Sequence, residues 1–347
     1  MTTTDKRVAR RRLPAEWETG GVVMMAWPHE ATDWADMLEE VSACYVAMAK
    51  AISEDNGLLI VAPDINDVIP YIPAGREVML VSAETNDTWT RDYGPITVEV
   101  DGRYRLLDYR FNGWGLKFAS DRDNLVNTRM LKAGCFTVPM ENRRMMVLEG
   151  GSIESDGKGT LLTTSRCLLS PNRNSPLTRR QIETRLKQQL GVQRVLWLDH
   201  GALEGDDTDS HIDTLARFAP NDVILYVKCD DKNDSHYEEL RAMEEELKQM
   251  RTLDGKPYQL IALPLPDPIY HDGERLPATY ANFLVTPHSV IMPVYGQKEN
   301  DRYAAGAIAT AFPGRKLLKV DCRALIRQHG SLHCATMQIP TECIDIS

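Results

Sequence analysis

The sequence predicts an α/β fold, because short apolar runs and helical patterns alternate through the whole of its 347 residues. Two further observations favour one continuous domain: no low-complexity linker interrupts the chain, and its composition does not change sharply along its length. Hydrophobic residues make up 43% and charged residues 26%, which is typical of a globular protein with a sizeable core. We therefore expect a single domain over residues 13–347, preceded by a flexible basic tail over residues 1–12.

The first clear element is an amphipathic helix over residues 33–53, with Asp33 as its N-cap. Its apolar side chains at helical spacing are Trp34, Met37, Leu38, Val41, Tyr45, Met48 and Ile52. Buried strands are predicted at residues 58–62, 78–81, 145–148, 195–198, 223–227, 258–263, 283–285, 290–294 and 317–320. Helical patterns lie at residues 178–190, 236–250, 300–311 and 322–328. Strand and helix groups recur at similar intervals, which hints at a modular architecture.

Charge and cysteine content exclude several classes of protein. The net charge of −10 disfavours nucleic acid and anionic lipid as partners and attracts cationic ligands. No apolar run approaches the ~18 to 20 residues of a membrane span, and the run at residues 22–27 is shorter than a signal-peptide core. We therefore expect a cytoplasmic protein. Seven cysteines without short spacings form neither a disulfide framework nor a zinc or redox motif.

Five polar or glycine-rich segments interrupt the apolar scaffold, and functional residues are expected in them. They are residues 85–95, 111–115, 148–152, 205–214 and 328–336. In the fourth segment His211 stands among four aspartates, which suits either an acidic surface turn or a divalent-metal site. If His211 and Asp213 open a strand, their side chains share one face, because the side-chain period of a strand is two.

The fifth segment holds the candidate nucleophile. Cys334 follows a loop that bears glycine and histidine and precedes the alternating stretch 335–339, so it lies at a loop-to-strand junction. The neighbouring His333 is not automatically its base, since adjacent side chains of an extended segment point to opposite sides. His211 is the better partner. The cysteines that lie in periodic apolar runs, and are expected to be structural, are Cys44, Cys167 and Cys229.

The other three segments place carboxylates or an aromatic ring beside glycine. Glu149 ends an apolar run before two glycines, which suits either a strand terminus or a carboxylate held where backbone approaches a ligand. Asp92 lies between Arg91 and a Tyr-Gly-Pro turn, an arrangement that suits a surface turn as well as a binding site. Glycines flank Trp114, which suits either a mobile lid or a plain turn.

Taken together, the five segments resemble the agmatine deiminase family, within the guanidino-modifying enzymes that include arginine deiminases and Porphyromonas-type peptidylarginine deiminases. The resemblance runs from residue 14 to residue 340. Its further motifs are residues 25–28, 168–174 and 278–283. It implies a five-fold pseudosymmetric α/β propeller, or pentein, built from ββαβ modules around a central polar channel.

The resemblance also implies roles for individual residues. Cys334 would be the nucleophile, His211 the general acid and base, and Glu149 the residue that orients the histidine. Asp92 and Asp213 would hold the guanidinium, a group that carboxylates bind through paired, charge-assisted hydrogen bonds. Neither a metal nor an organic cofactor is implied. The further candidate substrate contacts are Trp27, Asp87, Arg91, Trp114, Gly115, Asp207, Asp209 and Gly330.

One loop departs from the common family pattern. The family often has three glycines and then Asn-Ile-His before the cysteine, whereas residues 329–333 here read His-Gly-Ser-Leu-His. The departure affects the expected shape of this loop and therefore the expected preference among substrates. The proline-rich segment 264–278 is expected to be a loop near the mouth of the site.

The implied reaction is hydrolysis of agmatine to N-carbamoylputrescine and ammonia, through a covalent amidino-cysteine intermediate, on a route to putrescine. Agmatine carries a guanidinium and a distal ammonium but no carboxylate, so an acidic, aromatic-lined site suits it. Three alternatives stay open: deimination of free or peptidyl arginine by the same residues, a metal hydrolase built on His211 and Asp213, and a non-catalytic polyamine-binding module. The expected partner is a small cationic substrate, and a homo-oligomer is compatible with the sequence.

Overall fold

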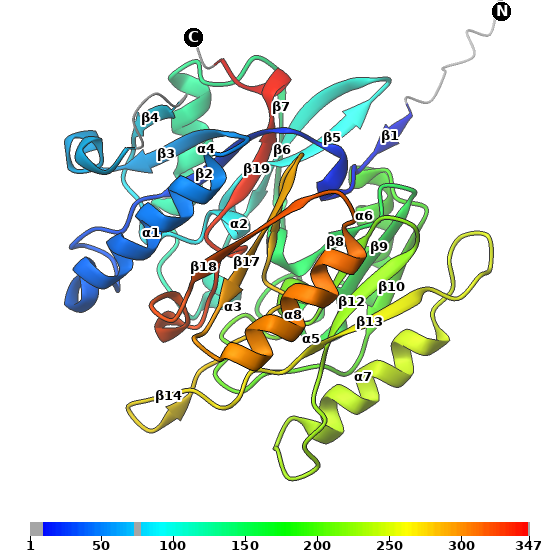
Figure 1. Ribbon diagram of the computed structural model, residues 1–347. Helices are drawn as coiled ribbons and strands as arrows, with labels where there is room; N and C mark the ends of the chain where they lie inside the picture. The colour runs from blue at the N-terminus through cyan, green and yellow to red at the C-terminus, as the bar shows by residue number, and fades with distance from the viewer. Residues whose placement is uncertain (1–9, 73–77, 346–347) are drawn as a thin grey trace, which may run out of the picture.

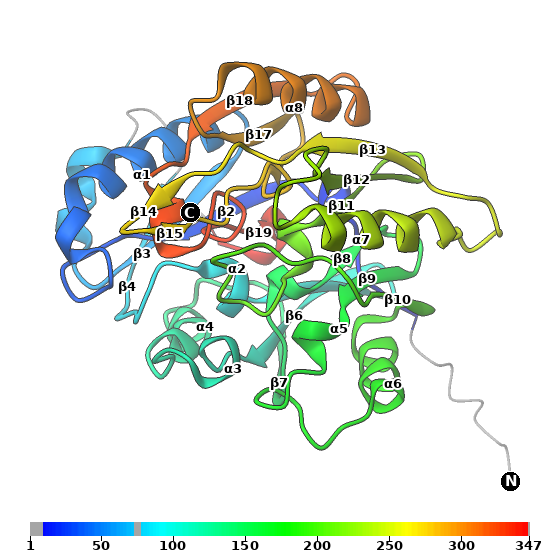
Figure 2. The same cartoon turned by 90° about the horizontal axis from the view of Figure 1, so that it is seen from below.

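The computed structural model describes residues 10–72 and 78–345, and it shows the mixed α/β fold that the sequence predicts. In these residues the strands form five sheets of three or four strands and one short hairpin. Five long helices lie around the outside of the sheets (Figures 1 and 2). They are α1 (Leu38–Ile52), α4 (Asp123–Lys132), α6 (Arg179–Leu190), α7 (Tyr237–Gln249) and α8 (Lys298–Ala311). No helix of the described ranges is long and apolar enough to cross a membrane.

The five larger sheets share one pairing pattern. In each, an antiparallel pair is extended by a parallel strand, and one of the long helices connects two parallel neighbours. The hydrogen-bonded orders are β1-β5-β6-β7, β10-β9-β8, β11-β12-β13, β16-β17-β18 and β19-β2-β3-β4, and the hairpin is β14-β15. The strands are β1 (Arg11–Arg12), β2 (Gly21–Ala26), β3 (Gly57–Ala62), β4 (Val78–Ser82), β5 (Ile96–Val100), β6 (Arg103–Arg110), β7 (Met140–Val147), β8 (Glu154–Ser155), β9 (Thr160–Thr164), β10 (Arg194–Leu198), β11 (Ala216–Ala219), β12 (Val223–Lys228), β13 (Gln259–Pro264), β14 (Tyr270–His271), β15 (Glu274–Arg275), β16 (Leu284–Val285), β17 (Ser289–Val294), β18 (Lys316–Asp321) and β19 (Met337–Pro340).

Most of the predicted elements are confirmed within one or two residues, but three differ. Asp33 is not an N-cap: the α-helix begins at Leu38 after a 3-10 turn, because Trp34 turns into the core, where its Nε1 donates to Thr88 Oγ1 at 3.0 Å. The helix predicted at residues 322–328 is reduced to the 3-10 helix η7 (Leu325–Gln328). The strand predicted at residues 145–148 is the end of the longer β7.

The basic N-terminal segment differs from the predicted flexible tail. Arg11 and Arg12 form β1, which pairs with β5. Their guanidinium groups bind Glu141 at 2.8 Å and Glu99 at 2.9 Å. The ordered chain therefore begins before residue 13, since backbone pairing and ion pairs hold this strand to the first sheet. Residues 1–9 of the predicted tail lie outside the described residues.

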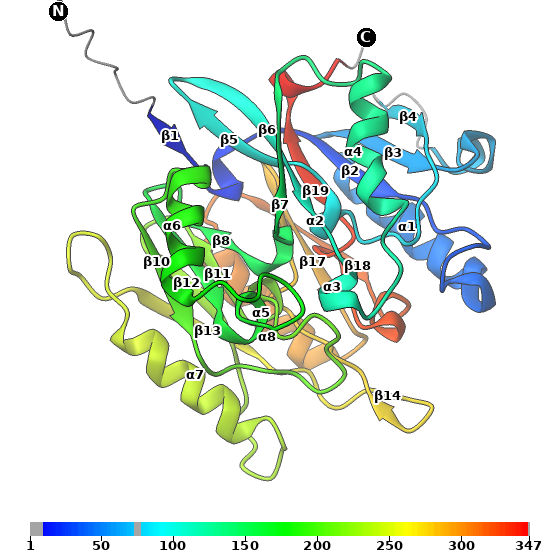
Figure 3. The ribbon, with the colours of Figure 1, turned by 180° about the vertical axis from the view of Figure 1, so that it is seen from behind.

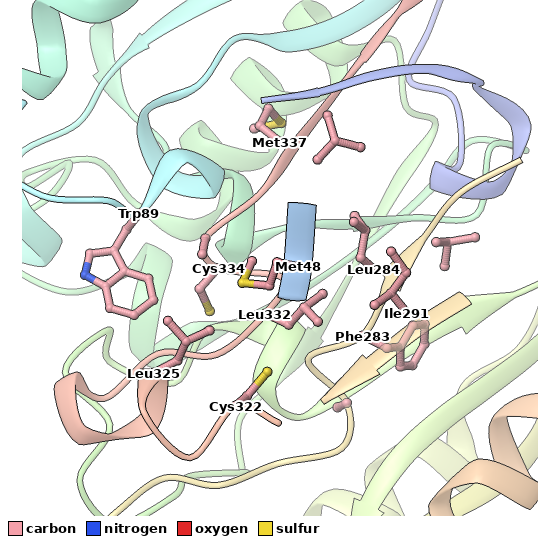
Figure 4. Packing of buried hydrophobic residues seen from close by; sticks show 14 of the residues in the cluster. Met48, Trp89, Phe283, Leu284, Ile291, Cys322, Leu325, Leu332, Cys334 and Met337 are labelled. Atoms are coloured by element: carbon pink, nitrogen blue, oxygen red, sulfur yellow. The ribbon is translucent and has the colours of Figure 1, made fainter. Parts of the chain in front are cut away.

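Apolar side chains fill the space between the sheets and helices in two clusters. Helix α1 buries Val41, Tyr45 and Met48 at helical spacing, as its periodicity predicts. The larger cluster reaches Cys334, and Figure 4 shows this cysteine at the edge of the packed side chains, with its sulfur pointing away from Met337. The cysteines predicted to be structural, Cys44, Cys167 and Cys229, are buried.

Candidate active site

The predicted polar segments converge on one pocket, which has a volume of about 320 Å³. Four of the five segments line it, with Asp87, Asp92, Trp114, Asp207, Gly330 and Cys334 in its wall. The remaining segment, residues 148–152, lies behind the wall, where the Gly151 amide donates to Asp92 Oδ1 at 2.9 Å. Figure 3 shows the two short helices that carry Asp92 and Trp114, α2 (Thr90–Tyr93) and α3 (Gly113–Leu116), toward the middle of the molecule.

Gly151 marks the point at which three predicted catalytic side chains meet. A Cβ atom added to this glycine would lie 2.7 Å from His211 Nδ1, 2.9 Å from Asp92 Oδ1 and 3.1 Å from Asp213 Oδ2. His211 Nδ1 is itself 3.6 Å from Asp92 Oδ1. The absence of a side chain at residue 151 therefore allows two carboxylates and an imidazole to approach one another.

Replacing Gly151 by alanine is expected to lower kcat/KM for the guanidinium substrate that the resemblance implies by at least about 100-fold, because a displacement of about 1 Å in a reacting group has an effect of this size. The control is Gly306→Ala in α8, where an added Cβ meets nothing within 4 Å. That change should leave kcat/KM unaltered and raise the free energy of unfolding by roughly 0.5 to 1 kcal/mol. Equal activity in the two variants would contradict the convergence at Gly151.

A turn, and not a strand, brings His211 and Asp213 together. His211 precedes the 3-10 helix η6 (Ile212–Thr214), and the Thr214 hydroxyl donates to the His211 carbonyl at 2.8 Å. Both side chains are fully buried. The alternative of an acidic surface turn with an exposed histidine is therefore wrong.

Cys334 lies in the turn that precedes β19, and its sulfur faces a carboxylate. The Sγ atom is 3.7 Å from Asp213 Oδ2 and 3.2 Å from Asn282 Nδ2. Asn282 Oδ1 also accepts the backbone N–H groups of His333 and Cys334, at 2.9 and 3.2 Å. The side chain of Asn282, which sequence reasoning placed only within a family motif, therefore fixes both the backbone and the sulfur of the candidate nucleophile.

His333 does not point away from the site, as an extended segment would require. Because the Thr336 amide bonds to the His333 carbonyl, the segment is a turn, and His333 Nδ1 lies 2.8 Å from Asp213 Oδ2. The other ring nitrogen, Nε2, lies 2.7 Å from Glu16 Oε1. His333 thus connects the carboxylate beside Cys334 to a second carboxylate from the start of the chain.

Glu16 belongs to a buried ionic network that sequence reasoning did not find. Arg217 Nη2 binds Glu16 at 2.7 Å, and its Nε binds Glu154 at 2.8 Å. Arg91 Nη1 lies 3.2 Å from Glu16 Oε1, and Arg91 Nη2 donates to Gln338 Oε1. Arg91, predicted as a substrate contact, therefore faces this network and not the pocket beside Cys334.

Glu149 is fully buried at the end of β7, where a second ion-pair chain holds it. Arg173 Nε donates to Glu149 Oε1 at 2.8 Å, and Arg173 Nη1 binds Asp209 Oδ2 at 2.6 Å. Lys117 holds the other oxygen of Asp209 at 2.8 Å. Two cations therefore neutralise Asp209, which does not line the pocket. Gly115 packs beside Asp209.

The remaining predicted contacts divide between the pocket and the core. Trp114 lines the pocket and donates from Nε1 to Asp92 Oδ2 at 2.9 Å. Asp87 and Asp207 add carboxylates to the wall, and burial raises the pKa of Asp87 to about 7. Trp27 does not line this pocket: it packs in the core against Tyr45 and Tyr71, with ring centroids 5.8 and 5.6 Å apart, because the strand that precedes it is buried on both faces.

The proline-rich segment 264–278 is not entirely a loop, since it contains the β14-β15 hairpin. Within it, His271 Nε2 lies 3.2 Å from Arg327, which lines the pocket. The segment therefore contacts a residue of the pocket wall, and its place near the mouth stays a prediction. Arg327 is already paired with Glu40 at 3.0 Å.

Burial and neighbouring charges set the protonation states of the site. Burial lowers the pKa of His211, but Asp92, Cys167 and Glu149 outweigh it and raise the pKa to about 10. Burial, followed by the charges of Asp213 and Asp92, raises the pKa of the Cys334 thiol well above its ordinary value. Before a ligand binds, the site at neutral pH therefore holds an imidazolium and a neutral thiol.

Burial also acts to raise the pKa of both carboxylates near the thiol. The pKa of Asp92 is raised, since burial and its neighbour Asp213 outweigh the attraction of His211. The pKa of Asp213 is lowered despite its burial, because the hydrogen bond and charge of His333 favour the ionised form. Asp213 is therefore the more firmly ionised of the two.

Comparison with known proteins agrees with this geometry. The family model described as Porphyromonas-type peptidyl-arginine deiminase matches residues 12–340. An agmatine deiminase variant from C. jejuni, solved with substrate bound, has a TM-score of 0.92 at 39% identity, and the match covers 98% of each chain. An Enterococcus faecalis agmatine deiminase has a TM-score of 0.87 at 31% identity over 96% of each chain.

A dimethylarginine dimethylaminohydrolase shares the fold alone. It has a TM-score of 0.50 at 14% identity, and the match covers 92% of this chain and all of that one. The family match, by contrast, extends over nearly the whole chain and includes every segment that meets at the pocket. The chain therefore belongs to the Porphyromonas-type peptidyl-arginine deiminase family, and with it to the hydrolases of guanidino carbon–nitrogen bonds.

Proposed function

We propose that the chain is an agmatine deiminase, which converts agmatine to N-carbamoylputrescine and ammonia on a route to putrescine. The observation that carries this proposal is the placement of Cys334, 3.7 Å from Asp213, in a pocket whose wall also holds Asp92. A planar cation bound between the two carboxylates would present its carbon to the sulfur. The names of the agmatine deiminases from C. jejuni and E. faecalis support the same substrate.

In the first half of the proposed reaction, the Cys334 thiolate attacks the guanidinium carbon and forms a carbon–sulfur bond. Asp92 and Asp213 accept hydrogen bonds from the guanidinium nitrogens. His211 gives its proton to the leaving nitrogen, the carbon–nitrogen bond breaks, and ammonia departs. An amidino group remains on the sulfur.

In the second half, water replaces ammonia. His211, now neutral, takes a proton from the water, whose oxygen attacks the amidino carbon. The carbon–sulfur bond then breaks and the sulfur leaves with its electron pair. The proton that remains on the added oxygen passes to solvent as the carbonyl forms, and the ureido product is released. Glu149 supports both halves because its carboxylate lies close to the imidazole and stabilises the protonated form.

Binding of the substrate cation is expected to ionise Cys334. Without a ligand, burial and two carboxylates hold the thiol pKa high. A guanidinium ion would neutralise those carboxylates and, with the imidazolium of His211, favour the thiolate. At neutral pH, the thiolate absorbance of the protein should rise when a short, unreactive alkylguanidinium is added. The rise should be missing in Cys334→Ala, and an unchanged absorbance in the unaltered protein would contradict this step.

Agmatine is favoured over free arginine by the charges of the pocket wall. Asp33, Asp87 and Asp207 suit a distal ammonium. The α-carboxylate of arginine would need a cation, and the arginine in the wall, Arg327, is already paired with Glu40. The pocket thus complements a substrate with a positive charge at each end.

The test is an ammonia and product assay on agmatine, arginine and an arginyl peptide in parallel. We expect kcat/KM to be highest for agmatine, and Asp207→Asn to raise KM for agmatine several-fold with little change in kcat. Asp230→Asn, on an exposed aspartate outside the pocket, is the matched control. A preference for either arginine substrate would reject the proposed substrate and keep the mechanism, whereas turnover of none of them would reject both.

We also propose that the five larger sheets are the modules of a five-fold pseudosymmetric propeller and that the chain forms a single domain. The shared pairing pattern of those sheets and their long outer helices support this arrangement. Because β1 pairs with the first of these sheets, the proposed domain includes Arg11 and Arg12 in addition to residues 13–347.

A further inference from the structure

We propose that Glu149, Cys167 and His211 form an inhibitory site for a thiophilic divalent cation of the Zn²⁺ type. One ligand atom from each residue, a carboxylate oxygen, the thiol sulfur and a ring nitrogen, lies within 4.8 Å of the other two. The residues come from separate parts of the chain: the end of β7, helix α5 (Ser165–Leu168) and the start of η6. All three are fully buried.

The second observation is that polar atoms of this cluster lack partners. Among the described residues, Glu149 Oε2 and both ring nitrogens of His211 have no hydrogen-bond partner. A buried polar group without a partner costs about 1 to 3 kcal/mol. Since Arg173 occupies only Glu149 Oε1, the second carboxylate oxygen is free to bind a cation. A metal ion binds the neutral imidazole and the thiolate, so its binding here releases the protons that His211 and Cys167 carry in the unliganded site.

The donor set is suited to zinc and not to magnesium or calcium, which prefer oxygen ligands. In a tetrahedral zinc site the ligand atoms lie about 3.3 to 3.8 Å apart, as bond lengths of ~2.0 to 2.3 Å require. Since the three atoms lie within 4.8 Å of one another, each pair would have to approach by at most about 1.0 to 1.5 Å. The carboxylate of Asp92, 3.6 Å from His211, would partly offset the charge of Arg173 beside a bound cation.

Occupation of this site would stop the reaction proposed above. A cation on His211 prevents that residue from giving or taking protons, and it also withdraws Glu149 from the imidazole. Its two positive charges would further oppose a guanidinium ion held by Asp92. This role is opposite to that of a metal hydrolase, because the metal here blocks turnover.

The direct test uses Co²⁺ as a spectroscopic probe of the intact protein. Co²⁺ should produce a sulfur-to-metal charge-transfer band in the unaltered protein and in Cys334→Ala, but not in Cys167→Ala. Cys229→Ala, in which another buried cysteine is removed, is the matched control and should keep the band. Loss of the band in Cys334→Ala with its retention in Cys167→Ala would assign the metal to the nucleophile and overturn the proposal. Absence of the band from the unaltered protein and from every variant would also overturn it.

A second measurement uses turnover, and it rests on the proposed function. Zn²⁺ should inhibit the unaltered protein, and a chelator should restore its rate. The concentration for half-inhibition should rise at least about tenfold in Cys167→Ala relative to that variant's own uninhibited rate, because loss of even an outer partner of a metal site weakens binding by ~10 to 100-fold. An equal Zn²⁺ concentration for half-inhibition in Cys167→Ala and in the unaltered protein would overturn the proposal. If no substrate is turned over, the Co²⁺ band still decides the metal site independently.

Discussion

Cys334→Ala is expected to lower the rate of ammonia release from agmatine by roughly four to six orders of magnitude, the effect of removing a covalent nucleophile. Within residues 10–72 and 78–345, no other thiol lines the pocket, and Asn282 holds this sulfur beside Asp213. Binding of agmatine should change only a few-fold, because the carboxylates that we propose to hold the guanidinium remain. The measurement is a single-turnover ammonia assay together with calorimetric titration of agmatine.

The matched control for this variant is Cys343→Ala, which removes a buried thiol that does not line the pocket. It should retain most of the activity. Cys334→Ala with more than about a hundredth of the original rate would show that the thiol does not carry out the covalent step, and the proposed mechanism would then be wrong.

Arg217→Met is expected to lower the free energy of unfolding by about 3 to 5 kcal/mol, because it leaves the buried carboxylate of Glu154 without its counter-ion and removes one of the cations that bind Glu16. The Arg217 side chain is 1% exposed and binds both Glu16 and Glu154. Burial, which outweighs the attraction of Arg217, already raises the pKa of Glu154 to about 7. Without the arginine this pKa rises further, so the folded state takes up a proton more readily than the unfolded chain. The decrease in the free energy of unfolding should therefore be larger at about pH 8 than at about pH 6.

Urea unfolding of Arg217→Met and Arg302→Met in parallel provides the comparison. Arg302 also pairs with a glutamate, Glu299, but both side chains are more than 60% exposed. That substitution should change the free energy of unfolding by only about 0 to 1 kcal/mol. Similar losses in the two variants would contradict a structural role for the buried network.

The sequence predicts the local elements and the residues of the site better than it predicts their pairing. Apolar runs reveal β12 and α8, because burial imposes a period that is visible within one segment. The contact of His333 with Glu16 joins residues 317 positions apart, so no local pattern records it. The only indication of this contact in the sequence is that a histidine stands next to the candidate nucleophile.

Two incorrect assignments have a similar physical origin. A tryptophan at the end of a buried strand has the same sequence pattern whether it lines a pocket or the core, and Trp27 lies in the core. An aspartate in an acidic segment gives no sign of whether a cation already binds it. Asp209 is occupied by Lys117 and Arg173, whereas Asp207, two residues earlier, lines the pocket.

The pairing of β19 with β2 has a consequence for biosynthesis. The N-terminal sheet receives its fourth strand from residues 337–340, and Cys334 lies just before them. A nascent chain emerging from the ribosome therefore presents every acidic group of the pocket before the sulfur that they surround. The proposed catalytic site can therefore be complete only after residues 334–340 have been synthesised and β19 has paired with β2.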